Sequence, residues 1–160
     1  MPADPGFPMK LEVTEMPGRR LAGVRHQGPY ARISEAFLRL FPQADALGLS
    51  QVAGAVYVAV YYDDPRATSE VALRSLAAVK VAEDATIGDL EEARLPSGRY
   101  VRTAFFGPHS GLGEAWRHFN DQRHEEGYQR RDGVSFEIYA GQENDAPPDR
   151  DRTDLYAPVA

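Results

Sequence analysis

Glu137 and Tyr139 are the side chains whose types and spacing point most directly to chemistry. They lie in Phe136-Glu137-Ile138-Tyr139, where strand alternation directs Glu137 and Tyr139 to the face opposite Phe136 and Ile138. A carboxylate in apolar surroundings raises its pKa or pairs with a cation. A carboxyl group beside a phenol is also suited to general acid–base catalysis on water. The alternative interpretation is a glutamate on a solvated face of a sheet.

Aromatic side chains gather around this segment and around two Gly-Pro turns. Flat rings stack on flat ligands and attract cations through their faces, although many aromatics at strand or helix spacing belong to the core. Tyr61 and Tyr62 face opposite sides of one strand, so only one of them is expected to reach a groove. The candidate ligand-binding residues are Glu137, Trp116, Tyr139, Tyr61, Tyr62, Phe106, His109, Tyr30 and Phe37.

The four histidines do not form a metal-binding pattern. His118 and His124 are six positions apart, whereas zinc ligands on a helix are four apart. The chain has no cysteine, no Gly-x-Ser-x-Gly elbow and no phosphate-binding loop. The sequence therefore predicts no metal site and no cofactor, and it gives no support to a serine hydrolase or a nucleotide-binding enzyme.

Composition excludes further classes. The net charge of −6 over 160 residues argues against a nucleic-acid partner, which requires a concentrated basic surface. No apolar run approaches the roughly 18 residues that a membrane span needs. Residues 1–9 contain three prolines and are expected to form a flexible leader that is not a signal peptide. We therefore expect a cytoplasmic protein with no membrane association.

The elements that must position Glu137 come from an internal repeat. Matching residues recur at an offset of 79 positions, and after the loss of one residue the offset becomes 78. Such a repeat predicts one structural unit used twice. The counterpart of Glu137 is Val58 without the gap or Ala59 with it, so the first copy lacks the carboxylate in either register. The matched pairs include Glu12/Glu91, Arg20/Arg99, Gly28/Gly107, Pro29/Pro108, Glu35/Glu114, Gly48/Gly127, Gly54/Gly133 and Tyr61/Tyr139.

Periodicity predicts the same elements in both copies, residues 10–81 and 89–160. In the first copy we expect strands at 10–15, 20–26, 52–62 and 74–81 and a helix from residue 31 to about 47, kinked or interrupted at Pro42. In the second copy we expect strands at 90–94, 99–106, 134–139 and 153–159, a helix at 111–126 and a loop at 142–152. The predicted fold class is α+β: one domain with an antiparallel sheet, two helices on one face and a ligand groove between the repeats.

Several motifs in this order resemble the GyrI-like small-molecule-binding domain, which is also the effector-binding module of AraC-type and MerR-type multidrug regulators. The resemblance extends from Lys10 to Val159. It implies a fold of tandem βαββ-type units (SHS2-like), bulky and often cationic aromatic ligands, and Glu137 as the acid that faces them. The motifs are Pro17-Gly18-Arg19-Arg20, the two Gly-Pro turns, Tyr61-Tyr62-Asp63-Asp64-Pro65, Phe136-Glu137-Ile138-Tyr139 and Asp154-Leu155-Tyr156-Ala157-Pro158-Val159.

The chain also departs from that family. Only about nine residues precede the first strand, too few for the helix-turn-helix domain of the regulators, so no direct contact with nucleic acid is expected. His109 stands where a tyrosine is commoner, which changes one wall of the groove.

Three functional hypotheses follow. The first is a stand-alone protein that senses or sequesters hydrophobic or cationic aromatic molecules such as drugs and dyes. The second is a hydrolase of cyclopropane-bearing alkylating compounds, with Glu137 as acid or base and Tyr139 or Tyr62 as proton donor. The third is a protein partner such as gyrase, as in the gyrase inhibitors of the family, or a separate regulator.

Overall fold

The computed structural model describes residues 9–139 and 152–160. Within these residues, the two α-helices and eight strands follow the order that the repeat predicts, two strands, a helix and two strands in each half. The first half contains β1 (Glu12–Met16), β2 (Arg19–Gln27), α1 (Ser34–Ala46), β3 (Tyr57–Tyr61) and β4 (Arg74–Lys80). The second half contains β5 (Glu91–Leu95), β6 (Gly98–Phe106), α2 (Leu112–Glu125), β7 (Ser135–Tyr139) and β8 (Arg152–Pro158).

All eight strands belong to one antiparallel sheet, in the order β1-β6-β8-β7-β3-β4-β2-β5. The two halves meet in the centre, where β3 pairs with β7. At each edge the first strand of one half pairs with the second strand of the other half, β1 with β6 and β5 with β2. This confirms the predicted α+β class and shows how the two halves share one sheet.

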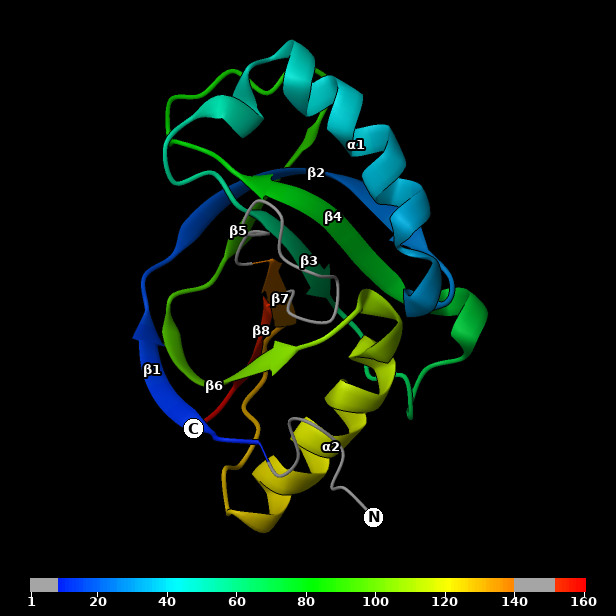
Figure 1. Ribbon diagram of the computed structural model, residues 1–160, viewed down its shortest axis with the longest axis vertical. Coiled ribbons are helices and arrows are strands. Elements are labelled where there is room, and N and C mark those ends of the chain that lie inside the picture. Colours follow the sequence, from blue (N-terminus) through cyan, green and yellow to red (C-terminus); the bar gives the residue numbers. More distant parts are fainter. Residues whose placement is uncertain (1–8, 140–151) are drawn as a thin grey trace.

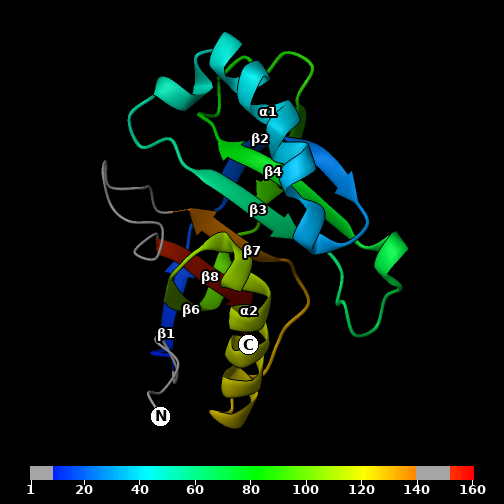
Figure 2. The ribbon, with the colours of Figure 1, turned by 45° about the vertical axis from the view of Figure 1, so that its right-hand side comes forward.

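Both helices lie on the same side of the sheet and leave β3 and β7 between them (Figures 1 and 2). α1 packs on the first half through Ala36, Phe37 and Leu40, and α2 packs on the second half through Ala115 and Phe119. The sheet is curled, so its other face packs against itself in a separate core. Neither helix in the described part of the chain is long and apolar enough to cross a membrane.

Glycines end both helices at matched positions. α1 stops at Ala46, and Gly48 follows with a left-handed φ of 72°; α2 stops at Glu125, and Gly127 follows with a φ of 83°. A left-handed residue just after a helix favours glycine, which has no side chain to clash there. The left-handed backbone after each helix therefore explains why glycine stands at both of these matched positions.

Three details differ from the expectations. The strand predicted at 52–62 spans only Tyr57–Tyr61, because a 3₁₀ turn at Leu49–Gln51 and Gly54, with a φ of 80°, interrupt the chain before it. The α1 helix continues through Pro42 without interruption. Met9, assigned to the leader, is buried in the core of the second half. Residues 1–8 and most of the loop predicted at 142–152 lie outside the described residues.

Candidate functional site

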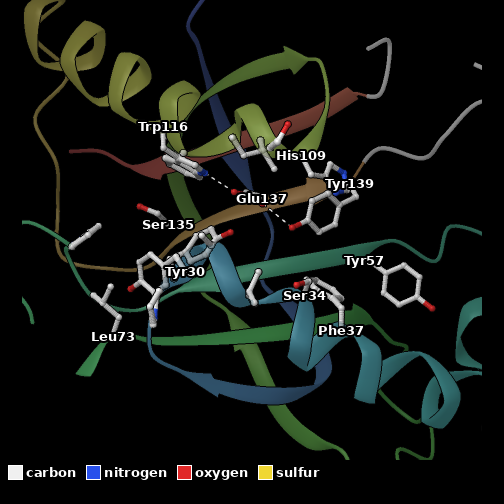
Figure 3. A pocket seen from close by; sticks show the side chains of 18 of the residues that line it. Tyr30, Ser34, Phe37, Tyr57, Leu73, His109, Trp116, Ser135, Glu137 and Tyr139 are labelled. Atoms are coloured by element: carbon white, nitrogen blue, oxygen red, sulfur yellow. Dashed lines mark hydrogen bonds between the residues drawn. The ribbon is translucent and has the colours of Figure 1, made fainter. Parts of the chain in front are cut away.

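A cleft of about 1410 Å³ lies between the two helices, above the central strands (Figure 3). Its walls come from α1 and the turn before it, and from α2 and the turn before that helix. Its floor is the outward face of β3 and β7, where alternate residues share one face. The predicted groove between the two halves is therefore present.

Strand register arranges the floor in three rows. Tyr57 lies opposite Tyr139 at one end, and Tyr61 lies opposite Ser135 at the other. Glu137 lies in the middle row, and the residue opposite it is Ala59. The internal repeat of the sequence pairs the same two positions, Ala59 and Glu137, when the loss of one residue is allowed. Glu137 is therefore the central polar residue of the floor, and its counterpart supplies only a methyl group.

The Glu137 side chain is buried, with only 1% of the residue exposed. The indole Nε1 of Trp116 donates a hydrogen bond to Oε1 at 2.6 Å, and the hydroxyl of Tyr139 donates one to Oε2 at 2.8 Å (Figure 3). Burial raises the pKa of Glu137, while hydrogen bonding from Trp116, Tyr139 and Tyr61 and the nearby His109 lower it. Neutral donors thus surround the carboxylate, and desolvation is still the largest influence on its pKa.

The phenols around the carboxylate remain protonated at neutral pH. Burial and the adjacent Glu137 raise the pKa of Tyr61 and Tyr139 far above the usual value for a tyrosine. A tyrosine that keeps its proton is a donor, so both phenols can hydrogen-bond to a negative oxygen.

The turns before the helices bring two further rings to the floor at equivalent places. The rings of Tyr30 and Tyr61 lie 4.6 Å apart, and those of His109 and Tyr139 lie 5.1 Å apart. The Tyr30 hydroxyl also donates a 2.8 Å hydrogen bond to the carbonyl oxygen of Asp63, which fixes that ring against the loop after β3. Contacts within the protein therefore position these rings on both halves.

Seven of the nine candidate residues line the cleft, and two do not. Tyr62 follows Tyr61 and faces the other way, where its ring lies 5.9 Å from the guanidinium of Arg74. Phe106 ends β6 with 56% of its surface exposed, because alternation buries its neighbour Phe105 against α2. The seven that line the cleft are Tyr30, Phe37, Tyr61, His109, Trp116, Glu137 and Tyr139.

Sequence reasoning did not select several other residues of the cleft. The repeat contained the signal, because these residues stand at matched positions of the two helices and the two central strands. Among them are Leu38, Phe41, Tyr57, Arg117, Asn120 and Ser135. Within residues 9–139 and 152–160, no three or more histidine, aspartate or glutamate side chains are grouped to hold a metal ion.

A deep, largely apolar cleft with one buried acid and several oriented donors defines a small-molecule-binding domain. Residues 9–160 match the GyrI-like small molecule binding domain, and the chain belongs to this family. A search of curated protein sequences found no significant match.

Solved structures share the fold. The EcmrR C-terminal domain aligns with a TM-score of 0.73 at 16% identity, covering 96% of this chain and 99% of that one. SAV2435 bound to tetraphenylphosphonium aligns with a TM-score of 0.67 at 14% identity, covering 95% and 94%. A hydrolase from Listeria innocua aligns with a TM-score of 0.64 at 15% identity, covering 94% and 92%.

Proposed function

We propose that the cleft binds bulky hydrophobic small molecules, including cationic aromatic compounds, and that Glu137 is the counter-charge for a ligand cation. The observation that carries this proposal is a buried carboxylate, held by Trp116 and Tyr139, at the centre of a cleft lined by aromatic rings. The protein would act by sensing or sequestering such compounds.

The energetics of burial favour a cationic ligand. Removing a carboxylate from water is costly unless a positive charge compensates it. The neighbours that stabilise the charged form of Glu137 are Trp116, Tyr139, Tyr61 and His109, and none of them is a lysine or an arginine. A ligand cation would supply the missing charge, and the surrounding rings would attract it through their faces. The tetraphenylphosphonium bound to SAV2435 is a compound of this kind.

Calorimetric titration with tetraphenylphosphonium tests the proposal. We expect binding by the wild type and an affinity reduced about 10- to 100-fold (about 1.4–2.8 kcal/mol) in Glu137→Gln, because the variant loses the Coulomb attraction between the carboxylate and the cation. Triphenylphosphine oxide, a neutral aromatic compound, is the matched control and should lose little affinity in the same variant. Equal affinity of both proteins for the cation would reject the role of Glu137.

The hydrogen bond between Tyr139 and Glu137 favours a second candidate function, hydrolysis of strained rings. A carboxyl group with a raised pKa beside a phenol can move a proton to or from water. Water would add across one carbon–carbon bond of a cyclopropane, with hydroxyl on one carbon and a proton on the other. Mass spectrometry after incubation with a cyclopropane-bearing alkylating compound tests this. A water adduct that disappears in Glu137→Gln and Tyr139→Phe would support hydrolysis, and unchanged compound would exclude it.

A further inference from the structure

The two halves of the cleft are built alike but differ in chemistry. Among the matched positions that line it, three pairs differ most clearly in polarity: Leu38 with Arg117, Phe41 with Asn120, and Tyr57 with Ser135. In these three pairs the residue of the first half is apolar or aromatic, and the residue of the second half is polar. We call Leu38, Phe41 and Tyr57 the apolar limb, and Arg117, Asn120 and Ser135 the polar limb.

The apolar limb lies at the Tyr57–Tyr139 end of the floor. The rings of Phe41 and Tyr57 are 5.0 Å apart, and Phe37 continues the contact at 5.6 Å from Tyr139. Leu38, on the same helix, is 71% exposed although it is apolar. An exposed leucine beside an aromatic cluster at the wall of a cleft is a surface that an apolar ligand group would cover.

The polar limb lies at the opposite end of the floor. Trp116 contacts Tyr61, with ring centroids 6.0 Å apart, and Ser135 pairs with Tyr61 across the strands. Arg117 and Asn120 follow Trp116 on α2 and also line the cleft. Arg117 is exposed and forms no ion pair with another described residue, so its guanidinium N–H groups can donate to a ligand.

Charge near the polar limb is mixed. Arg66 and Asp121 also line the cleft, and with Asn120 they line a smaller hollow, so neither sign of charge dominates beside Asn120. A hydroxyl or amide group can both donate and accept hydrogen bonds, so it suits this surface better than an ion of one sign. Packed against Leu38 and Phe41, such a group would find no hydrogen-bond partner on either side chain, and covering it there without a partner is costly.

We propose that the cleft selects and orients asymmetric amphipathic ligands. Such a ligand has an aromatic body in the apolar limb, a cation beside Glu137 in the middle row, and a hydrophilic arm in the polar limb. The cleft volume of about 1410 Å³ exceeds the roughly 300–1,000 Å³ of most ligand pockets, which leaves room for a ligand that occupies both limbs. This inference rests on the proposed function and specifies the class of ligand, an asymmetric amphipathic cation.

Two nearly isosteric cations test the inference, pentyltriphenylphosphonium and (4-hydroxybutyl)triphenylphosphonium. They differ by a terminal methyl or hydroxyl group. We expect the wild type to bind the hydroxyl compound at least as tightly as the pentyl compound. The double variant Arg117→Leu/Asn120→Phe makes the polar limb resemble the apolar limb and should prefer the pentyl compound about tenfold. The single variant Arg117→Leu, at an exposed position, should shift the ratio in the same direction.

Phe41→Ala is the control on the other limb. It should weaken both compounds and leave their ratio unchanged, because it removes contacts with the common aromatic body. A tenfold preference of the wild type for the pentyl compound would overturn the inference and leave the proposed function intact. If neither Arg117→Leu nor Arg117→Leu/Asn120→Phe changed the ratio of the two affinities, the inference would also be overturned and the proposed function would remain intact. Failure of the wild type to bind either cation would overturn the inference and the proposed function together.

Discussion

Ala59 and Glu137 lie directly opposite each other on the two central strands. They are also matched positions of the repeat at its offset of 78 residues. The middle of the floor is thus the place where a residue and its counterpart in the other half become neighbours. Two acids there would repel each other at close range, and the alanine of the first half leaves Glu137 as the one carboxylate of the middle row.

A second acid at this place is therefore expected to destabilise the fold. Ala59 is fully buried, so Ala59→Gln should cost about 1–3 kcal/mol through overpacking. Ala59→Glu should cost more at neutral pH, because two facing carboxylates cannot both be charged without a penalty. Urea unfolding at about pH 7 and about pH 4 measures the difference, which should shrink in acid. Equal stability of the two variants at neutral pH would contradict this account.

The raised pKa of Glu137 has a direct consequence for stability. Its cause is burial, so the folded state holds the proton more tightly than the unfolded state. Below the ordinary pKa both states are protonated and the group has no effect. As the pH rises towards the folded pKa, the unfolded state ionises first and stability falls. Relative to the wild type, Glu137→Gln should therefore gain stability between about pH 4 and neutral pH. Parallel stability profiles of the two proteins would show that the pKa is not raised.

Cation affinity should follow the opposite trend with pH. The ionised carboxylate attracts a ligand cation and the protonated form does not. The affinity for tetraphenylphosphonium should rise from about pH 4 and level off once Glu137 is ionised. In Glu137→Gln this contribution of the carboxylate should be absent, so the affinity should depend less on pH in this range. Calorimetry in two buffers of different ionisation enthalpy would also detect the proton released on binding.

Trp116 should report ligand binding by its fluorescence. It is the single tryptophan of the chain, and its indole lines the cleft and donates to Glu137. A ligand beside that carboxylate changes the surroundings of the ring, so the emission intensity or maximum should change with saturation. The midpoint should agree with calorimetry. Calorimetric binding without any change in emission would mean that the ligand occupies another place.

Met9 should contribute to stability although it lies at the start of the described chain. It is 5% exposed, and its backbone N–H donates a 2.8 Å hydrogen bond to Oε1 of Gln122 on α2. Met9→Ala should lower the free energy of unfolding by about 2–5 kcal/mol, the usual cost of deleting a buried methionine side chain. Lys10→Ala, next to it on the surface, is the control and should change stability by less than about 0.5 kcal/mol.

The local sequence pattern was sufficient to predict most of the helices and strands. Periodicity predicted the central strands and both helices, and the predicted helices at residues 31 to about 47 and 111–126 contain α1 and α2. The strand predicted at 52–62 was too long, because valines and tyrosines favour extended structure but do not reveal the turn at Gly54. The helix α1 continues through Pro42, whereas local propensity predicted a kink or an interruption there.

The amino-acid sequence by itself determined the order of elements, the equivalence of the two halves and the face of the strand that carries Glu137. These follow from the chemistry and spacing of near neighbours along the chain. Only the tertiary structure decided that β3 pairs with β7, that Trp116 and Tyr139 both reach the Glu137 carboxylate, and that Tyr62 and Phe106 face away from the cleft. Those relations depend on packing between distant segments, where a shift of one residue in strand register would turn every side chain to the other face.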